Sequence, residues 1–195
     1  MSRSRSREMD LTTGSPVWSL LKFSIPVILG NLFQLFYTLA DSVIVGKTLG
    51  AESLAAVGST SIIIYFVFCF INGFTGGFGI CLGQRCGAKD EQGMRKSIAV
   101  STLLSIAFTV VLTLVCCLLS RQILVWMQIP DDIAEEANAY MFVVLLGTGA
   151  TVFYNMISNM LRALGDSKTP LYFLVFSSVL NIILDIVFIV PMHMG

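Results

Sequence analysis

The chain has 195 residues, of which 55% are hydrophobic and 12% are charged, and its mean hydropathy is +0.83. Soluble domains carry about 25% charged residues, so this composition excludes an ordinary soluble enzyme and predicts an integral membrane protein with short loops. Basic and acidic residues balance to a net charge of zero, and we expect no nucleic-acid partner.

Five apolar runs follow a polar N-terminal segment. Residues 1–22 begin with MSRSRSREMD, which has too little apolar surface to fold, and are predicted to be a cytoplasmic tail and helix lead-in. A membrane helix needs about 20 mostly apolar residues, so an all-α protein is predicted with five transmembrane helices, at 23–45, 54–80, 98–119, 136–158 and 170–190. Residues 191–195 then form a short external end.

The basic residues fix the expected orientation. With the N-terminus in the cytoplasm, the outer side receives only Lys47 and Arg121. The cytoplasmic side receives ten basic residues: Arg3, Arg5, Arg7, Lys22, Arg85, Lys89, Arg95, Lys96, Arg162 and Lys168. The positive-inside rule therefore favours a multi-pass protein of the cytoplasmic membrane with its N-terminus inside. For the four basic residues between 85 and 96, contact with lipid headgroups is a lesser alternative to a purely topological role.

Two of the runs carry a carboxylate on a polar face. At about 100° per residue, Gln34, Thr38 and Asp41 share one sector of the first run with Asn31, and Ser178, Asn181 and Asp185 share a face of the fifth. A charged side chain within the bilayer costs at least roughly 2.5 kcal/mol, so both aspartates are interpreted as functional. They lie at similar depth in the outer half, and with the Asn181 amide they supply hard oxygen ligands suited to Na+, or carboxylates suited to H+.

Other polar and small residues have weaker interpretations. Tyr140, Thr148, Thr151, Asn155 and Ser158 form a third stripe, and for Tyr140, Asn155, Gln34 and Thr38 an interhelical hydrogen bond is the competing role. The glycine pairs Gly73/Gly77 and Gly79/Gly83 are interpreted as sites of close helix packing. The five cysteines contain no C-x-x-C pair and the one histidine is His193, so we expect no cofactor and no metal site beyond Na+.

Pro26 lies inside the first run. A proline there removes one backbone hydrogen bond and clashes with the preceding turn, so a bend is predicted near the cytoplasmic end, either static or acting as a hinge.

Several motifs, in order, resemble the multidrug and toxic compound extrusion family of secondary transporters. The first is a P-x14-D spacing between Pro26 and Asp41, which is followed by VGKTLGAESLAAVG. The first cytoplasmic loop contains GQRCGAKDEQ and the second contains LRALGDSKTP. The fifth run contains an N-x3-D spacing in NIILD. The resemblance implies an antiporter that exports amphiphilic, often cationic drugs in exchange for Na+ or H+. It also implies a cation site at Asp41, Asn181 and Asp185, with Gln34, Tyr140 and Asn155 lining the same cavity.

The same resemblance implies two six-helix lobes around a central cavity. The five predicted spans are then most of one lobe, and we expect the chain to be truncated, with a missing sixth helix and second lobe as its partners beside lipid and substrate. A self-associating half transporter is the lesser alternative. Three rival functions remain open: a flippase, a protease, and a non-transporting membrane partner or scaffold, for which the polar stripes would be unneeded. A lipid-linked sugar flippase of the same superfamily usually has a more cationic cavity. An intramembrane aspartyl protease needs Tyr-Asp and Gly-x-Gly-Asp motifs, and the only Gly-Asp pair in this sequence, Gly165-Asp166, falls in a loop. We therefore expect a transporter and not an enzyme.

Overall fold

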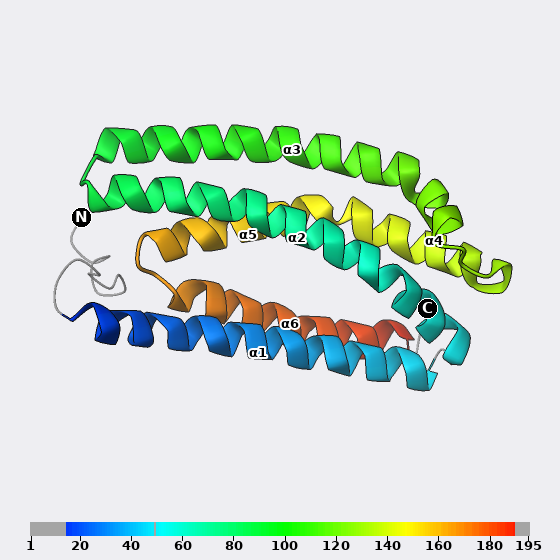
Figure 1. Cartoon of the computed structure of the whole chain (residues 1–195). Coiled ribbons are helices and arrows are strands. Elements are labelled where there is room, and N and C mark those ends of the chain that lie inside the picture. Colours follow the sequence, from blue (N-terminus) through cyan, green and yellow to red (C-terminus); the bar gives the residue numbers. More distant parts are fainter. Residues whose placement is uncertain (1–14, 49, 190–195) are drawn as a thin grey trace.

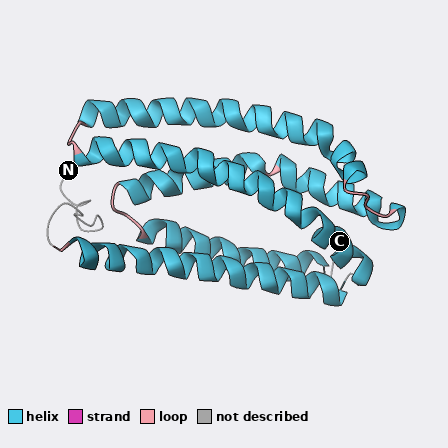
Figure 2. Ribbon diagram, viewed as in Figure 1, coloured by secondary structure: helices cyan, strands magenta, loops and turns pink. Residues whose placement is uncertain are grey.

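The computed structural model describes residues 15–48 and 50–189, and within them the chain is almost entirely helical (Figure 1, Figure 2). The helices are α1 (Pro16–Thr48), α2 (Ala51–Gly87), α3 (Glu91–Trp126), α4 (Asp131–Leu146), α5 (Thr148–Ala163) and α6 (Lys168–Ile189). The described part of the chain contains no strand, which confirms the all-α fold. The predictions for Arg3, Arg5, Arg7, His193 and the external end at 191–195 lie outside the described residues.

The predicted number of spans agrees with the structure, with one correction. α1, α2, α3 and α6 are each long and apolar enough to cross a bilayer, and α4 with α5 meets the same criterion as a pair that is bent by 42°. The sequence predicted one continuous helix over 136–158, and this is wrong because the helix breaks at Gly147. Gly147 and Gly149 flank Thr148 and are weak helix formers, and the Thr148 hydroxyl donates a hydrogen bond to the Leu145 carbonyl.

The helices form two groups. α1 packs along α6, and α2, α3, α4 and α5 pack among themselves, with the closest association between α2 and α5. Figure 1 shows the α1 and α6 pair running beside the larger group, and the two groups join where α1 leads into α2 and where α5 leads into α6. The turn between α2 and α3, the turn between α5 and α6 and the start of α1 lie at the same end of the bundle (Figure 1). The described basic residues that we expect on the cytoplasmic side lie at this end of the bundle.

The larger group holds the apolar core. Its ten buried residues include Ile71 of α2, Met141 and Leu145 of α4, and Val152 of α5, all 2% exposed or less. A second cluster of Leu82, Met156 and Met160 continues the core toward the α2–α3 turn. Elsewhere the surface is apolar, and only 6–22% of the four long spans is buried inside the protein. A surface of this kind is stable only in contact with lipid, so the chain is a multi-pass membrane protein.

The two glycine pairs of α2 differ in how closely another helix packs against them. A Cβ atom added to Gly79 would lie 3.2 Å from the backbone oxygen of Asn159 on α5, so the two helices approach closely there, and one added to Gly83 would lie 3.9 Å from Ala163. Gly73 and Gly77 have no described atom within 4 Å of such a position. The packing interpretation is therefore confirmed for Gly79/Gly83, whereas Gly73/Gly77 makes no such contact within the described residues.

Candidate functional site

The candidate site begins on α6 with two unsatisfied acceptors. Asn181 and Asp185 are one helical turn apart, so their side chains lie on the same face of α6. The Asn181 Oδ1 and Asp185 Oδ2 atoms are both inaccessible to solvent and accept no hydrogen bond from any described residue. A buried acceptor without a donor costs about 1–3 kcal/mol, so this face of α6 is built to receive a donor or a cation.

Asp41 brings a second carboxylate to this face. It lies on α1, which packs against α6, and its side chain is half-buried. Asp41 interacts electrostatically with Asp185, so the two carboxylates that the sequence singled out lie near one another across the α1–α6 interface. The prediction that the two polar faces share a depth agrees with this geometry.

Tyr140 reaches the same region from the other helix group. It lies on α4, and it interacts electrostatically with Asp41 and with Tyr37, which precedes Asp41 by one turn. α1 and α4 make no backbone contact in the described part of the chain, so Tyr140 faces Asp41 across the space between the two groups. Tyr37 was not selected from the sequence, although its i, i+4 spacing from Asp41 places it on the same side of α1.

The remaining candidates are not joined to the carboxylates by any described contact. The Thr38 hydroxyl donates 2.9 Å to the carbonyl oxygen of Gln34, and both side chains are exposed. The Asn155 amide likewise donates 2.9 Å to the Thr151 carbonyl within α5. Asn155 follows Tyr140 by 15 residues, which is roughly 22 Å of helix, so it belongs to another level of the bundle. The proposed cavity-lining roles of Gln34, Thr38 and Asn155 stay predictions.

The chemistry available at Asp41, Asn181 and Asp185 is that of oxygen acceptors. Two carboxylates and one amide oxygen can coordinate a hard cation or hold a proton, and such oxygens are poor ligands for soft transition metals. The basic residues of the helices lie toward helix ends: Lys47 and Arg85 are in the last turns of α1 and α2, and Arg162 is in the last turn of α5. These three basic residues therefore do not share the depth of the two aspartates.

Asp166, the acidic residue of the loop Gly165-Asp166 pair, has a structural role. Its Oδ1 atom accepts hydrogen bonds from the backbone N–H groups of Lys168 and Thr169 at 3.1 and 3.0 Å, and its Oδ2 accepts from the Thr169 hydroxyl at 2.6 Å. These bonds cap the start of α6. The Gly-Asp pair thus serves helix capping, and it does not approach the membrane carboxylates as an aspartyl protease would require.

One hydrogen bond between helices was not predicted. The Asn159 amide donates 3.2 Å to the Thr75 hydroxyl and links α5 to α2 beside the close approach at Gly79. Thr75 is fully buried and also donates 2.8 Å to the Ile71 carbonyl. Because the bond belongs to the tight α2–α5 interface, it contributes to packing within the larger group and not to the carboxylate site.

The fold and this site define the chain as an all-α multi-pass membrane protein with intramembrane carboxylates. The chain belongs to the MatE family, whose model matches residues 26–187. It is 35% identical over 186 residues to the "Probable multidrug resistance protein YpnP" of Bacillus subtilis (strain 168), covering 95% of this chain and 42% of that protein. The resemblance drawn from the loop motifs and from Pro26 and Asp41 is therefore confirmed.

Solved structures agree with the family assignment. Crystal structures of MATE in the bent and straight conformations superpose on the chain with TM-scores of 0.85 and 0.84, each at 31% identity. In both cases the match covers 92% of this chain and 40% of the other. The chain thus spans about two fifths of the length of the relatives that it matches.

Proposed function

We propose that this chain supplies the cation-coupling lobe of an antiporter that exports amphiphilic, often cationic compounds across the cytoplasmic membrane. The observation that carries the proposal is the pair of buried, unpartnered oxygens on Asn181 and Asp185, which faces a second carboxylate, Asp41, on the adjacent helix. The MatE family match and the relative named as a multidrug resistance protein support the substrate class.

The coupling ion is Na+ or H+. Either would bind Asp41, Asn181 and Asp185, because each satisfies the acceptor oxygens and reduces the repulsion between the two carboxylates. With the site empty of cation, repulsion between the aspartates favours separation of α1 from α6, and with cation bound the two helices are held together. Ion binding therefore favours one arrangement of α1 over another, which is the requirement for coupling.

Pro26 supplies the point at which α1 can change direction. α1 continues through Pro26 from Pro16 to Thr48, and the proline ring leaves the carbonyl of Lys22 without its usual helical N–H partner. Asp41 lies 15 residues further along, so a small change of angle at Pro26 moves it over a lever arm of roughly 22 Å. Crystal structures of a related MATE in bent and straight conformations support a hinge of this kind.

The surroundings of the site favour this proposal over its rivals. A flippase for lipid-linked sugars calls for cations deep in the cavity, whereas Lys47, Arg85 and Arg162 lie in the last turns of α1, α2 and α5. A protease calls for a second aspartate at a Gly-Asp pair, and Asp166 instead caps α6. The cluster of Lys and Arg at one end of the bundle supports an orientation with that end in the cytoplasm. In the complete transporter, we propose that a further helix and a second lobe close the cavity beside α1 and α4.

Transport by paired variants tests the proposal. The chain is expressed as part of the full-length transporter, and export of a cationic dye driven by a Na+ or H+ gradient is measured in vesicles. Asp41→Asn and Asp185→Asn should each abolish gradient-driven export at unchanged expression, whereas Glu136→Gln, an exposed carboxylate on α4, should leave it intact. Export at the native rate by both aspartate variants would refute the proposed site.

A further inference from the structure

A groove at the end of the bundle lies outside the site described above. It has a volume of about 570 Å³ and runs between α2 and α3 from the turn that joins them toward the middle of the bundle. Its walls include Phe78, Cys81 and Arg85 of α2 and Lys96, Val100 and Leu104 of α3. None of these residues belongs to the Asp41, Asn181 and Asp185 cluster, which is formed by α1 and α6.

The chemistry of the groove changes along its length. Arg85 and Lys96 lie at its mouth, and Phe78 and Leu104 lie deeper. Phe78 is seven residues before Arg85 and Leu104 is eight residues after Lys96, so the apolar part begins roughly 10–12 Å below the charges. A cationic mouth above an apolar wall matches a phospholipid, whose phosphate stands at the membrane edge and whose acyl chains extend into the bilayer.

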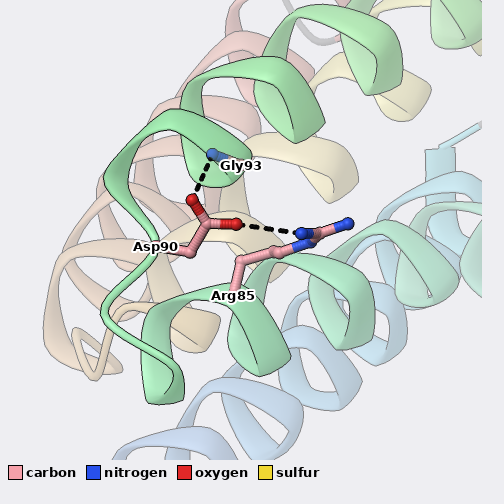
Figure 3. Close-up of polar contacts among 3 residues, drawn as sticks. All are labelled: Arg85, Asp90 and Gly93. Atoms are coloured by element: carbon pink, nitrogen blue, oxygen red, sulfur yellow. Dashed lines mark hydrogen bonds and ion pairs between the residues drawn. The ribbon is translucent and has the colours of Figure 1, made fainter.

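Arg85 is held in position by the turn itself (Figure 3). Its NH1 atom donates 2.9 Å to Oδ2 of Asp90, whose Oδ1 accepts 2.8 Å from the backbone N–H of Gly93. The Gly93 N–H bond, with the Arg85 guanidinium, keeps the pKa of Asp90 below its ordinary value, so this carboxylate stays ionised. A Cβ added to Gly93 would overlap the Asp90 carboxylate, so a larger residue at this position would displace that side chain.

The mouth retains capacity for an anion. The Arg85 guanidinium has five N–H donors and shares NH1 with Asp90, so donors remain for a phosphate. Lys96 is exposed and makes no ion pair within the described residues. Counting Asp90, which also lines the groove, the mouth carries two positive charges and one negative charge. This net positive charge complements an anionic headgroup and does not favour a zwitterionic one.

We infer that the groove between α2 and α3 binds one anionic phospholipid from the surrounding membrane. The phosphate occupies the mouth between Arg85 and Lys96, and one acyl chain lies against Phe78, Val100 and Leu104. A soluble phosphate compound would use the charged mouth alone, whereas a neutral lipid would use the apolar wall alone. The lipid would tie the first turn of α3 to the end of α2 and so fix this corner of the lobe at the membrane surface.

Lipid binding to the whole 195-residue chain in detergent micelles, followed by native mass spectrometry, tests the inference. The probes are dioctanoyl phosphatidylglycerol, dioctanoyl phosphatidylcholine and glycerol phosphate. Phosphatidylglycerol should bind with a stoichiometry of one and more tightly than either of the others. Lys96→Gln should weaken this binding about fivefold, which is the contribution of one basic residue near an anionic lipid surface. Arg95→Gln is the matched control, because Arg95 is the adjacent exposed residue and does not line the groove.

Two further variants separate the groove from general surface charge. Asp90→Asn removes the one acidic group of the mouth and should strengthen phosphatidylglycerol binding, and Cys81→Phe fills the apolar wall and should weaken it without a change of charge. Circular dichroism of each variant checks that the helices are retained. Equal weakening by Lys96→Gln and Arg95→Gln, or equal affinity for the anionic and zwitterionic lipids, would overturn the inference.

Discussion

The close approach of α2 and α5 at Gly79 yields a sharp test of the packing. In Gly79→Ala the new Cβ would lie 3.2 Å from the Asn159 backbone oxygen and 3.3 Å from the Asn159 Cβ. Neither atom is the end of a flexible side chain, so the backbone of α5 must shift by a few tenths of an ångström for the methyl group to fit. The same movement strains the Asn159–Thr75 hydrogen bond. Overpacking of this kind typically costs about 1–3 kcal/mol.

Gly77→Ala is the matched control for Gly79→Ala. Both glycines lie in the middle of α2, so the gain in helix propensity, about 1 kcal/mol for Gly to Ala in water, enters both variants and cancels in their difference. A Cβ at Gly77 meets no described atom within 4 Å. The free energy of unfolding, measured by SDS titration in mixed micelles with circular dichroism, should therefore be about 1–3 kcal/mol lower for Gly79→Ala than for Gly77→Ala. Equal stability of the two variants would refute the inferred close approach.

Three further outcomes are expected. The Gly93 amide resonance should titrate with Asp90 at a midpoint below that of an unperturbed aspartate, because the Gly93 N–H bond and the Arg85 guanidinium lower the pKa of Asp90. The cap on α3 is then present at neutral pH and is lost only as the pH falls through that midpoint, and a midpoint at or above the unperturbed one contradicts the prediction. Asp166→Ala should lower the free energy of unfolding by about 1 kcal/mol or more, because the cap of α6 is lost. Asp166→Asn should lower the free energy of unfolding less, and an equal decrease in both variants would argue against capping. Pro26→Ala should lower the turnover of dye export more than it lowers thermal stability, and an unchanged rate would make Pro26 a purely architectural residue.

The carboxylate faces could be predicted from the sequence because they depend on helical periodicity alone. Asp41 shares a face with Gln34 and Thr38, and Asp185 with Asn181, at the spacing of a helix of 3.6 residues per turn. Apolar run length located the spans for the same reason. Which faces meet depends on tertiary packing, so the approach of Tyr140 to Asp41 across two helix groups needed the structure.

Local breaks and pairings were less predictable. The helix breaks at Gly147 although the sequence is apolar on both sides of this residue. Hydropathy reports the polarity of side chains, so it does not reveal where a helix breaks. Gly77 and Gly79 are two residues apart in the same glycine-rich stretch, yet only Gly79 faces α5, because a difference of two residues turns a helix by about 200°. Arg85 is interpreted from the sequence as a topological charge, and the structure shows that the turn between α2 and α3 also pairs it with Asp90.

The central claim is that Asp41, Asn181 and Asp185 bind the coupling cation, and infrared difference spectroscopy of the purified chain tests it most directly. The carboxyl bands are recorded with and without Na+ at constant ionic strength, and again across a pH step. We expect that one of these two changes alters the carboxyl bands of the native chain, and that the alteration is lost in Asp41→Asn/Asp185→Asn. Glu136→Gln should retain the native response. A response to Na+ or to pH that is identical in the native chain and in the double aspartate variant would contradict the claim.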